Sequence, residues 1–120
     1  MIGYVEVVPL LIAACPSYRG SLPAAGAEED EGEYLTVGRL VAHLIELLSR
    51  DDTACLRTVF GVVEWVLEEG DDEARSLLTE GFFDDLTNPD FYAESSKDPH
   101  DFVPWLGPCA REQPSVQPLL

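Results

Sequence analysis

The chain has 120 residues, of which 46% are hydrophobic and 25% charged, a composition typical of one ordinary globular domain. Its 23 acidic residues stand against 7 lysines and arginines, so the formal net charge is −16. Such a surface repels phosphate groups, which argues against binding to nucleic acid or an anionic membrane. The acidity either serves solubility alone or attracts basic proteins.

The three cysteines, Cys15, Cys55 and Cys109, lie far apart in the sequence and are odd in number. No CxxC pair or Cys/His cluster indicates a zinc site, and no spacing indicates a disulfide framework. We therefore expect free thiols in a reducing cytoplasm, with no metal and no cofactor. The position of Cys55 at the start of a predicted helix is one where a thiol pKa can fall.

Residues 2–15 carry apolar side chains at helical spacing, although Pro9 and the β-branched residues around it leave a short strand as the alternative. The stretch PLLIAAC resembles an export signal that ends at a lipidated cysteine, Cys15. No basic residue precedes it, and Glu6 and Pro9 interrupt it, so we expect a cytoplasmic protein. No segment is long enough to span a membrane, and 20–33 reads as a mobile loop rich in Pro, Gly, Ala and acid.

Three amphipathic helices are predicted between Thr36 and Leu86. The first is expected to end near Arg50, and Asp51 or Asp52 to cap the second. Gly70 is expected to close the second helix and Asp71 or Asp72 to cap the third, which the Asn88–Pro89 pair ends. The apolar stripes of the three helices are Val37, Leu40, Val41, Leu44, Leu47 and Leu48; Leu56, Val59, Phe60, Val63, Val66 and Leu67; and Ala74, Leu77, Leu78, Gly81 and Phe82.

Short connections predict that consecutive helices pack antiparallel. The stretches DDTACLRTVF and DDEARSLLTE begin 20 residues apart, which suggests a HEAT-like helical hairpin. The sequence therefore predicts a single all-α domain over 1–120, with a core over about 34–108. A short C-terminal helix capped by Asp101, with Pro104 early in it, and a turn with a second short helix at Gly107–Pro108 are expected before a frayed tail over 112–120.

Nine carboxylates lie between Val63 and Leu86, mostly on predicted polar faces and turns. A carboxylate enzyme would need Glu64 or Asp84 in a cleft with a raised pKa. His43 and Glu46 supply half of a carboxylate-bridged metal site, but His100 lies in a proline-flanked loop and does not complete it. We therefore expect neither an enzyme nor a metal protein.

Two aromatic side chains, Trp65 and Phe83, point away from the apolar stripes of their own helices. One interpretation is that the N-terminal segment or the aromatic C-terminal segment covers them. The other is an exposed aromatic centre ringed by acids, which is how a protein-binding surface for a basic partner is built.

The order EYLTVGRLVAHLIELL, VFGVVEWVLEEGDDEARSLLTEGFFDDL and WLGP, over about 33–108, resembles a group of small, acidic, helical bacterial proteins that are largely uncharacterised. Some members resemble the immunity proteins that accompany polymorphic toxins, and the resemblance implies a protein that binds and blocks one partner. It rests on the apolar pattern together with Glu64, Gly81 and the Leu106-Gly107-Pro108 turn. We expect Glu64 to lie beside the apolar stripe and to pair with an arginine such as Arg39 or Arg57.

The predicted function is a non-catalytic immunity-type protein that neutralises a basic toxin or enzyme, and the alternative is a helical adaptor that forms homo-oligomers through Trp65 and Phe83. The predicted partner-binding residues are Trp65, Glu68, Glu69, Asp72, Glu80, Phe83, Asp84 and Asp85.

Overall fold

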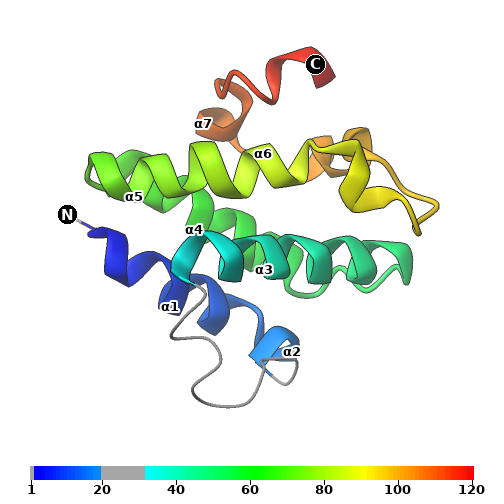
Figure 1. Cartoon of the computed structure of the whole chain (residues 1–120), viewed down its shortest axis with the longest axis horizontal. Coiled ribbons are helices and arrows are strands. Elements are labelled where there is room, and N and C mark those ends of the chain that lie inside the picture. The colour runs from blue at the N-terminus through cyan, green and yellow to red at the C-terminus, as the bar shows by residue number, and fades with distance from the viewer. Residues whose placement is uncertain (1, 20–31) are drawn as a thin grey trace.

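The computed structural model describes residues 2–19 and 32–120, and every regular element in these two ranges is helical (Figure 1). The all-α prediction is therefore confirmed. The predicted loop over 20–33 falls largely outside the described residues. Its last two residues, Gly32 and Glu33, already belong to a helix.

The elements follow one another with short connections in the described part of the chain. They are α1 Tyr4–Ala14, α2 Pro16–Arg19, α3 Gly32–Ser49, α4 Leu56–Glu69, α5 Asp72–Ser76, the π-helical segment η2 Leu77–Phe82, α6 Phe83–Leu86, the 3-10 turns η3 Pro89–Tyr92 and η4 Pro99–Trp105, α7 Pro108–Arg111, and the 3-10 turn η5 Gln117–Leu119.

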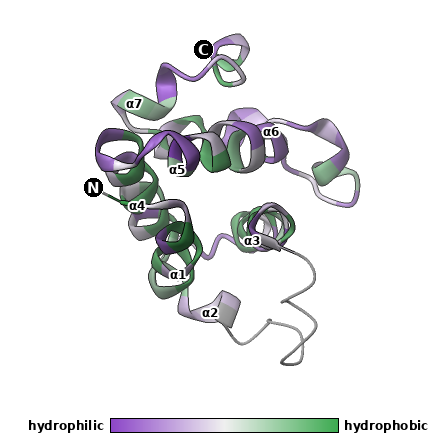
Figure 2. Ribbon diagram, turned by 60° about the vertical axis from the view of Figure 1, so that its left-hand side comes forward, coloured by the Kyte–Doolittle hydropathy of each residue, from purple (hydrophilic) through white to green (hydrophobic). Residues whose placement is uncertain are grey.

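Helices α3 and α4 form where the amphipathic pattern predicts them, because their apolar residues recur at the spacing that places them on one face. Every residue of the two predicted stripes is buried, and Ile45 joins them. Helix α3 begins at Gly32, four residues before the predicted start at Thr36. Figure 2 shows hydrophobic residues, in green, on α1, α3 and α4, and hydrophilic residues, in purple, on α5 and around α6.

The segment formed by α5, η2 and α6 is one continuous rod that lies alongside α3 and runs in the same direction (Figure 1). Helix α3 packs chiefly on η2 and also on α6, rather than on its neighbour in sequence. Helix α4 packs against α1 on one side and against α7 and η4 on another. The core therefore joins residues from both ends of the chain.

The middle of the rod is a π-helical turn, and this turn decides where Phe83 points. The backbone N–H of Phe83 donates to Leu78 O, five residues earlier, as a π turn requires. One additional residue in the turn rotates the following side chains by about 100° relative to an uninterrupted α-helix. Phe82 and Phe83 are consequently both fully buried, with their rings edge to face at 5.3 Å. The prediction that Phe83 lies away from the core face is wrong.

The N-terminal segment forms helix α1 with Pro9 inside it, exposed to solvent. A single parallel bridge joins Ile2 to Gly70, with Ile2 N donating to Glu69 O and Asp71 N donating to Ile2 O. This bridge fastens the start of α1 to the corner between α4 and α5. Cys15 ends α1, and the short helix α2 follows it, before the predicted loop.

The caps predicted at the α4–α5 corner form, whereas the caps predicted for the start of α4 do not. Gly70 ends α4, and the Asp71 side chain accepts from Ala74 N at 2.8 Å, so both predictions at this corner are confirmed. The predicted caps of α4, Asp51 and Asp52, are wrong because Cys55 is the N-cap residue and no side chain caps it. Asp51 instead takes a left-handed conformation, with φ of 59°, in the turn after α3.

The C-terminal segment is more ordered than the sequence indicates. Turn η4 is capped by Asp98, and the predicted cap, Asp101, occupies the reciprocal position of a capping box. Pro104 lies late in η4 rather than at its start. The helix predicted after Gly107 is confirmed as α7. The expected frayed tail contains Val116, which is fully buried, and the turn η5.

Candidate functional site

The predicted partner-binding residues do not form one continuous face. Trp65 is 50% exposed, as the helical wheel predicts. Phe83 is fully buried, so it cannot contact a partner and is no longer a predicted binding residue. Most of the predicted acids are exposed; they are Glu68, Glu69, Asp72, Glu80 and Asp84. These acids fall into two groups, one around the α4–α5 corner and one further along the rod.

The first group surrounds Gly70 and is called here the acidic corner, defined by Glu68, Glu69, Asp72 and Glu73. All four side chains are exposed. They cluster because α4 ends and α5 begins within three residues. Among the described residues, the ion pair at this corner joins Asp72 to Arg75 at 2.9 Å, and both side chains are exposed. An ion pair in that setting contributes little and leaves the corner strongly negative.

A hollow of about 400 Å³ opens beside the acidic corner, and two tyrosines line it. Tyr4 of α1 and Tyr34 of α3 face Asp72 and Glu73, with Ser76 completing the lining. Desolvation, followed by nearby carboxylates, raises the pKa of both tyrosines, so their hydroxyl groups are neutral. The sequence does not indicate Tyr34, which is 43% exposed, because the hollow forms where α1, α3 and α5 meet.

The second group of acids lies further along the rod, with Glu80 in η2 and Asp84 and Asp85 in α6. Asp85 is half-buried, and its carboxylate packs against the backbone of Gly38 in α3, where an added Cβ would lie 3.0 Å from Asp85 Oδ2. Burial, and then the neighbouring Asp84, raises the pKa of Asp85. Glu80 accepts from the Tyr34 hydroxyl at 3.4 Å. Asp85 therefore contributes to helix packing, and Asp84 and Glu80 are the exposed acids of this group.

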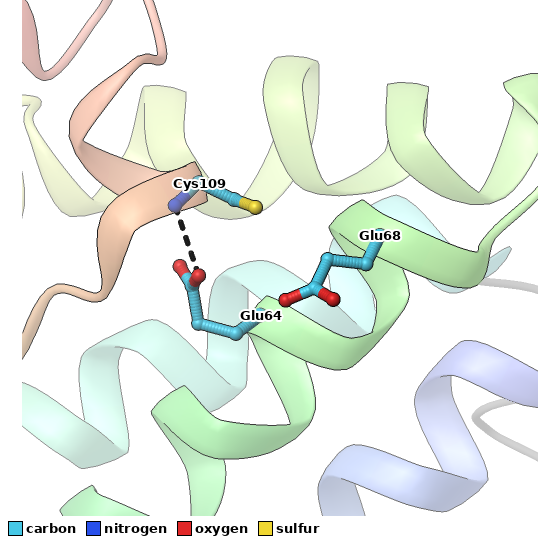
Figure 3. Close-up of side chains that lie close together, drawn as sticks. All are labelled: Glu64, Glu68 and Cys109. Carbon is cyan, nitrogen blue, oxygen red and sulfur yellow. Dashed lines mark hydrogen bonds between the residues drawn. The ribbon is translucent and has the colours of Figure 1, made fainter.

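Glu64 has a structural role that the sequence did not predict. Its carboxylate oxygens accept from Cys109 N at 2.9 Å and from Ala110 N at 2.8 Å, as Figure 3 shows for Cys109. These amides belong to the first turn of α7, which has no intrahelical acceptor for them. The predicted pairing of Glu64 with an arginine is replaced by this cap between helices.

The turn Leu106-Gly107-Pro108 fits this arrangement. A Cβ built at Gly107 would lie 2.4 Å from Glu64 Cδ, so only glycine leaves room for the carboxylate. Pro108 follows as the first residue of α7, a position at which a missing N–H costs nothing. Two of the features on which the family resemblance rests, Glu64 and this turn, are therefore in direct contact.

Glu64, Glu68 and Cys109 bring three metal-ligating atoms within 4.8 Å of one another (Figure 3). Both oxygens of Glu64 already accept backbone amides. Burial and the adjacent carboxylates, Glu64 first among them, raise the pKa of the Cys109 thiol, which keeps it protonated. Helix capping accounts for this cluster, and we assign no metal to it.

The two histidines lie in different surroundings. His43 Nε2 is 2.9 Å from Ser17 Oγ, and its ring is tilted against Tyr18 at 5.5 Å. Burial lowers the pKa of His43, and the carboxylate of Glu46 acts in the opposite direction. His100 lies in the first turn of η4, with its Nδ1 3.3 Å from Oδ1 of the N-cap residue Asp98. His43 thus holds α2 against α3, a role that the sequence did not indicate.

The fold brings together two of the three cysteines. Cys15 Sγ and Cys55 Sγ lie 2.8 Å apart, although 40 residues separate them in the sequence. Cys15 is fully buried and Cys55 is half-buried. Burial, and then the contact with Cys15, raises the pKa of Cys55 to about 12, so the predicted lowering at this helix start is wrong.

A model of one protein family, a domain of unknown function (DUF7674), matches residues 8–113. The chain belongs to this family. Comparisons with curated proteins and with solved structures found no match. The matched range of the DUF7674 domain includes Glu64, Gly107, the acidic corner and both cysteines of the close pair. Among the described residues, no helix is both long and apolar enough to cross a bilayer.

Proposed function

We propose that this DUF7674 domain is a non-catalytic binding module for a basic protein, acting in the bacterial cytoplasm in the manner of an immunity protein. The observation that carries the proposal is the position of Trp65. Its side chain is 50% exposed one helical turn before Glu68 and Glu69, so an exposed aromatic ring and two acids share one face of α4. Exposed tryptophans are enriched among the residues that dominate binding energies.

The surroundings of Trp65 favour contact with a large partner. Gly61, one turn earlier on α4, has no atoms within 4 Å of an added Cβ, so the surface beside the indole ring is open. The acidic corner begins one turn after Trp65 and borders the hollow lined by Tyr4 and Tyr34. The net charge of −16 extends the attraction for a basic partner beyond direct contact and would raise the association rate.

The experiment is affinity capture of the tagged full chain from its host at low and at high salt, with mass spectrometry of what is retained. The test variant is Glu68→Lys with Glu69→Lys. Both residues lie in the last turn of α4, where a cation is favoured by the helix dipole, so this reversal does not weaken the helix. A matched control, Asp90→Lys with Glu94→Lys, changes the net charge equally at two exposed positions outside the acidic corner.

We expect one basic protein to be retained in about equal amount with the tagged chain at low salt and released at high salt. The control variant should retain it, and the Glu68/Glu69 variant and Trp65→Ala should lose it. Retention of the same partner by all variants at every salt concentration would contradict the proposed surface.

A second candidate, an adaptor that forms homo-oligomers, is favoured by the same exposed indole and the open surface at Gly61. Light scattering on the purified chain separates the two proposals. A dimer that Trp65→Ala converts to a monomer would support the adaptor, whereas a monomer that binds a basic partner would support the immunity-type protein. The burial of Phe83 removes one of the two aromatic residues on which the oligomer hypothesis rested.

A further inference from the structure

The end of α1 and the start of α4 place two thiols closer together than separate thiols normally approach. The 2.8 Å between Cys15 Sγ and Cys55 Sγ is too short for a relaxed S–H···S contact and longer than the 2.03–2.05 Å of a disulfide bond. A small movement of either sulfur would therefore reach bonding distance. The two residues directly flank α1 and α4, which pack against each other.

The elements around the two sulfurs hold them in place. Cys15 is the C-cap residue of α1, and Cys55 is the N-cap residue of α4. After Cys15, helix α2 is fastened to α3 by the contact of Ser17 Oγ with His43 Nε2 and by the Tyr18 hydroxyl, which donates to Thr36 O at 3.4 Å. This fixed geometry gives the second thiol a high effective concentration toward the first.

We propose that Cys15 and Cys55 are a redox modification site that forms a reversible intramolecular disulfide when the protein meets a low-molecular-weight disulfide. The site is independent of the proposed binding of a basic partner. Its two cysteines are not among the residues of the proposed binding surface, Trp65, Glu68 and Glu69. Cys109 takes no part, because its nearest chemical neighbours are Glu64 and Glu68 of α4.

The reaction balances as two thiol–disulfide exchanges. Cys55, the less buried thiol, loses its proton and attacks one sulfur of the reagent, whose S–S bond breaks and releases one thiolate. Cys15 then loses its proton and attacks Cys55 Sγ, and the mixed disulfide breaks to release the second thiolate. The protein gives up two electrons and two protons, and the reagent becomes two free thiols.

The closed disulfide would join α1 to α4 around a loop that contains α2 and α3. Closing a loop of 40 residues restricts the unfolded chain more than the folded one, so the oxidised protein should be the more stable form. The stability gain should appear as a rise in Tm of about 10 °C.

The experiment treats the purified full chain with oxidised glutathione or with dithiothreitol and then alkylates the free thiols in denaturant. Trypsin separates the three cysteines, since cleavage after Arg19, Arg50, Arg57, Lys97 and Arg111 places them in fragments 1–19, 51–57 and 98–111. We expect fragments 1–19 and 51–57 to be joined, with the loss of two hydrogen atoms, and Cys109 to be alkylated. Dithiothreitol should restore three alkylated cysteines.

Two variants make the result specific. Cys109→Ser should form the same cross-link and show the same rise in Tm. Cys55→Ala should show neither, and its half-buried position makes it the safer substitution than the fully buried Cys15. Three alkylatable cysteines after exposure to oxidised glutathione, or glutathione attached to Cys55 without closure onto Cys15, would overturn the proposal.

Discussion

Glu64 of α4 caps the first turn of α7, because its two carboxylate oxygens accept the backbone amides of Cys109 and Ala110. The cap connects the central helix to a segment 45 residues later. The cap explains why an acid, Glu64, stands at the edge of the apolar stripe of α4. Without it, a helix of four residues would have unpaired amides next to the core.

Replacing Glu64 with glutamine tests this cap. The amide group retains one acceptor oxygen but presents N–H donors to the second backbone amide. We therefore expect a loss of about 1–2 kcal/mol in the free energy of unfolding, measured by urea denaturation. Glu68→Gln is the matched control, with the same change in charge on the same helix at an exposed position, and it should change stability by less than about 0.5 kcal/mol. Equal effects of the two variants would contradict the cap.

The contact between Gly107 and Glu64 predicts a coupled pair of mutations. Gly107→Ala places a Cβ where the Glu64 carboxylate lies and should displace it, although the extended backbone at Gly107 accepts alanine. In a Glu64→Ala background this clash no longer exists. A double-mutant cycle should therefore show a coupling energy of about 1 kcal/mol or more. Additive effects would show that Gly107 is not required for the approach of Glu64.

The π turn predicts opposite sensitivities for two aromatic residues that the sequence pattern treats alike. Phe83 is fully buried against Phe82, so Phe83→Ala should destabilise the fold by about 3–5 kcal/mol, and the milder Phe83→Leu by about 1 kcal/mol. Trp65 is half exposed, and Trp65→Ala should cost less than about 1 kcal/mol. Thermal unfolding of the three variants measures the difference. Comparable losses at both positions would mean that Phe83 is not in the core.

Burial gives the oxidation of Cys55 a defined dependence on pH. The titratable groups that raise its pKa to about 12 are Cys15 and Asp52, after desolvation itself. Because the thiolate reacts, and its fraction increases about tenfold per pH unit well below the pKa, the rate with oxidised glutathione should rise about tenfold from pH 7 to 8 and again from 8 to 9. Alkylation of the remaining free thiols at successive times, followed by mass spectrometry, measures this rate, and the Cys55→Ala variant gives the background reaction of the other cysteines. A rate that levels off below pH 9 would contradict the raised pKa.

Much of the fold follows from local sequence. The stripes of α3 and α4 recur at the helical period, so burial of one face sets both their identity and their orientation. The corner at Gly70 and Asp71 is equally local, because a cap needs only a residue within three positions of the amide that it accepts. The exposed acids beside Trp65 could also be predicted, because helical spacing alone places Glu68 and Glu69 one turn after it.

The tertiary structure decided the rest, and in each case the reason is a contact between residues distant in sequence or a departure from the regular period. The π turn at η2 allows Phe82 and Phe83 to enter one core together, which a period of 3.6 residues does not predict. The cap on α7 requires Glu64 to meet amides 45 residues away, and the thiol pair joins positions 40 residues apart. No local pattern encodes these distances, because only the packing of α1, α4 and α7 around one core brings the partners together.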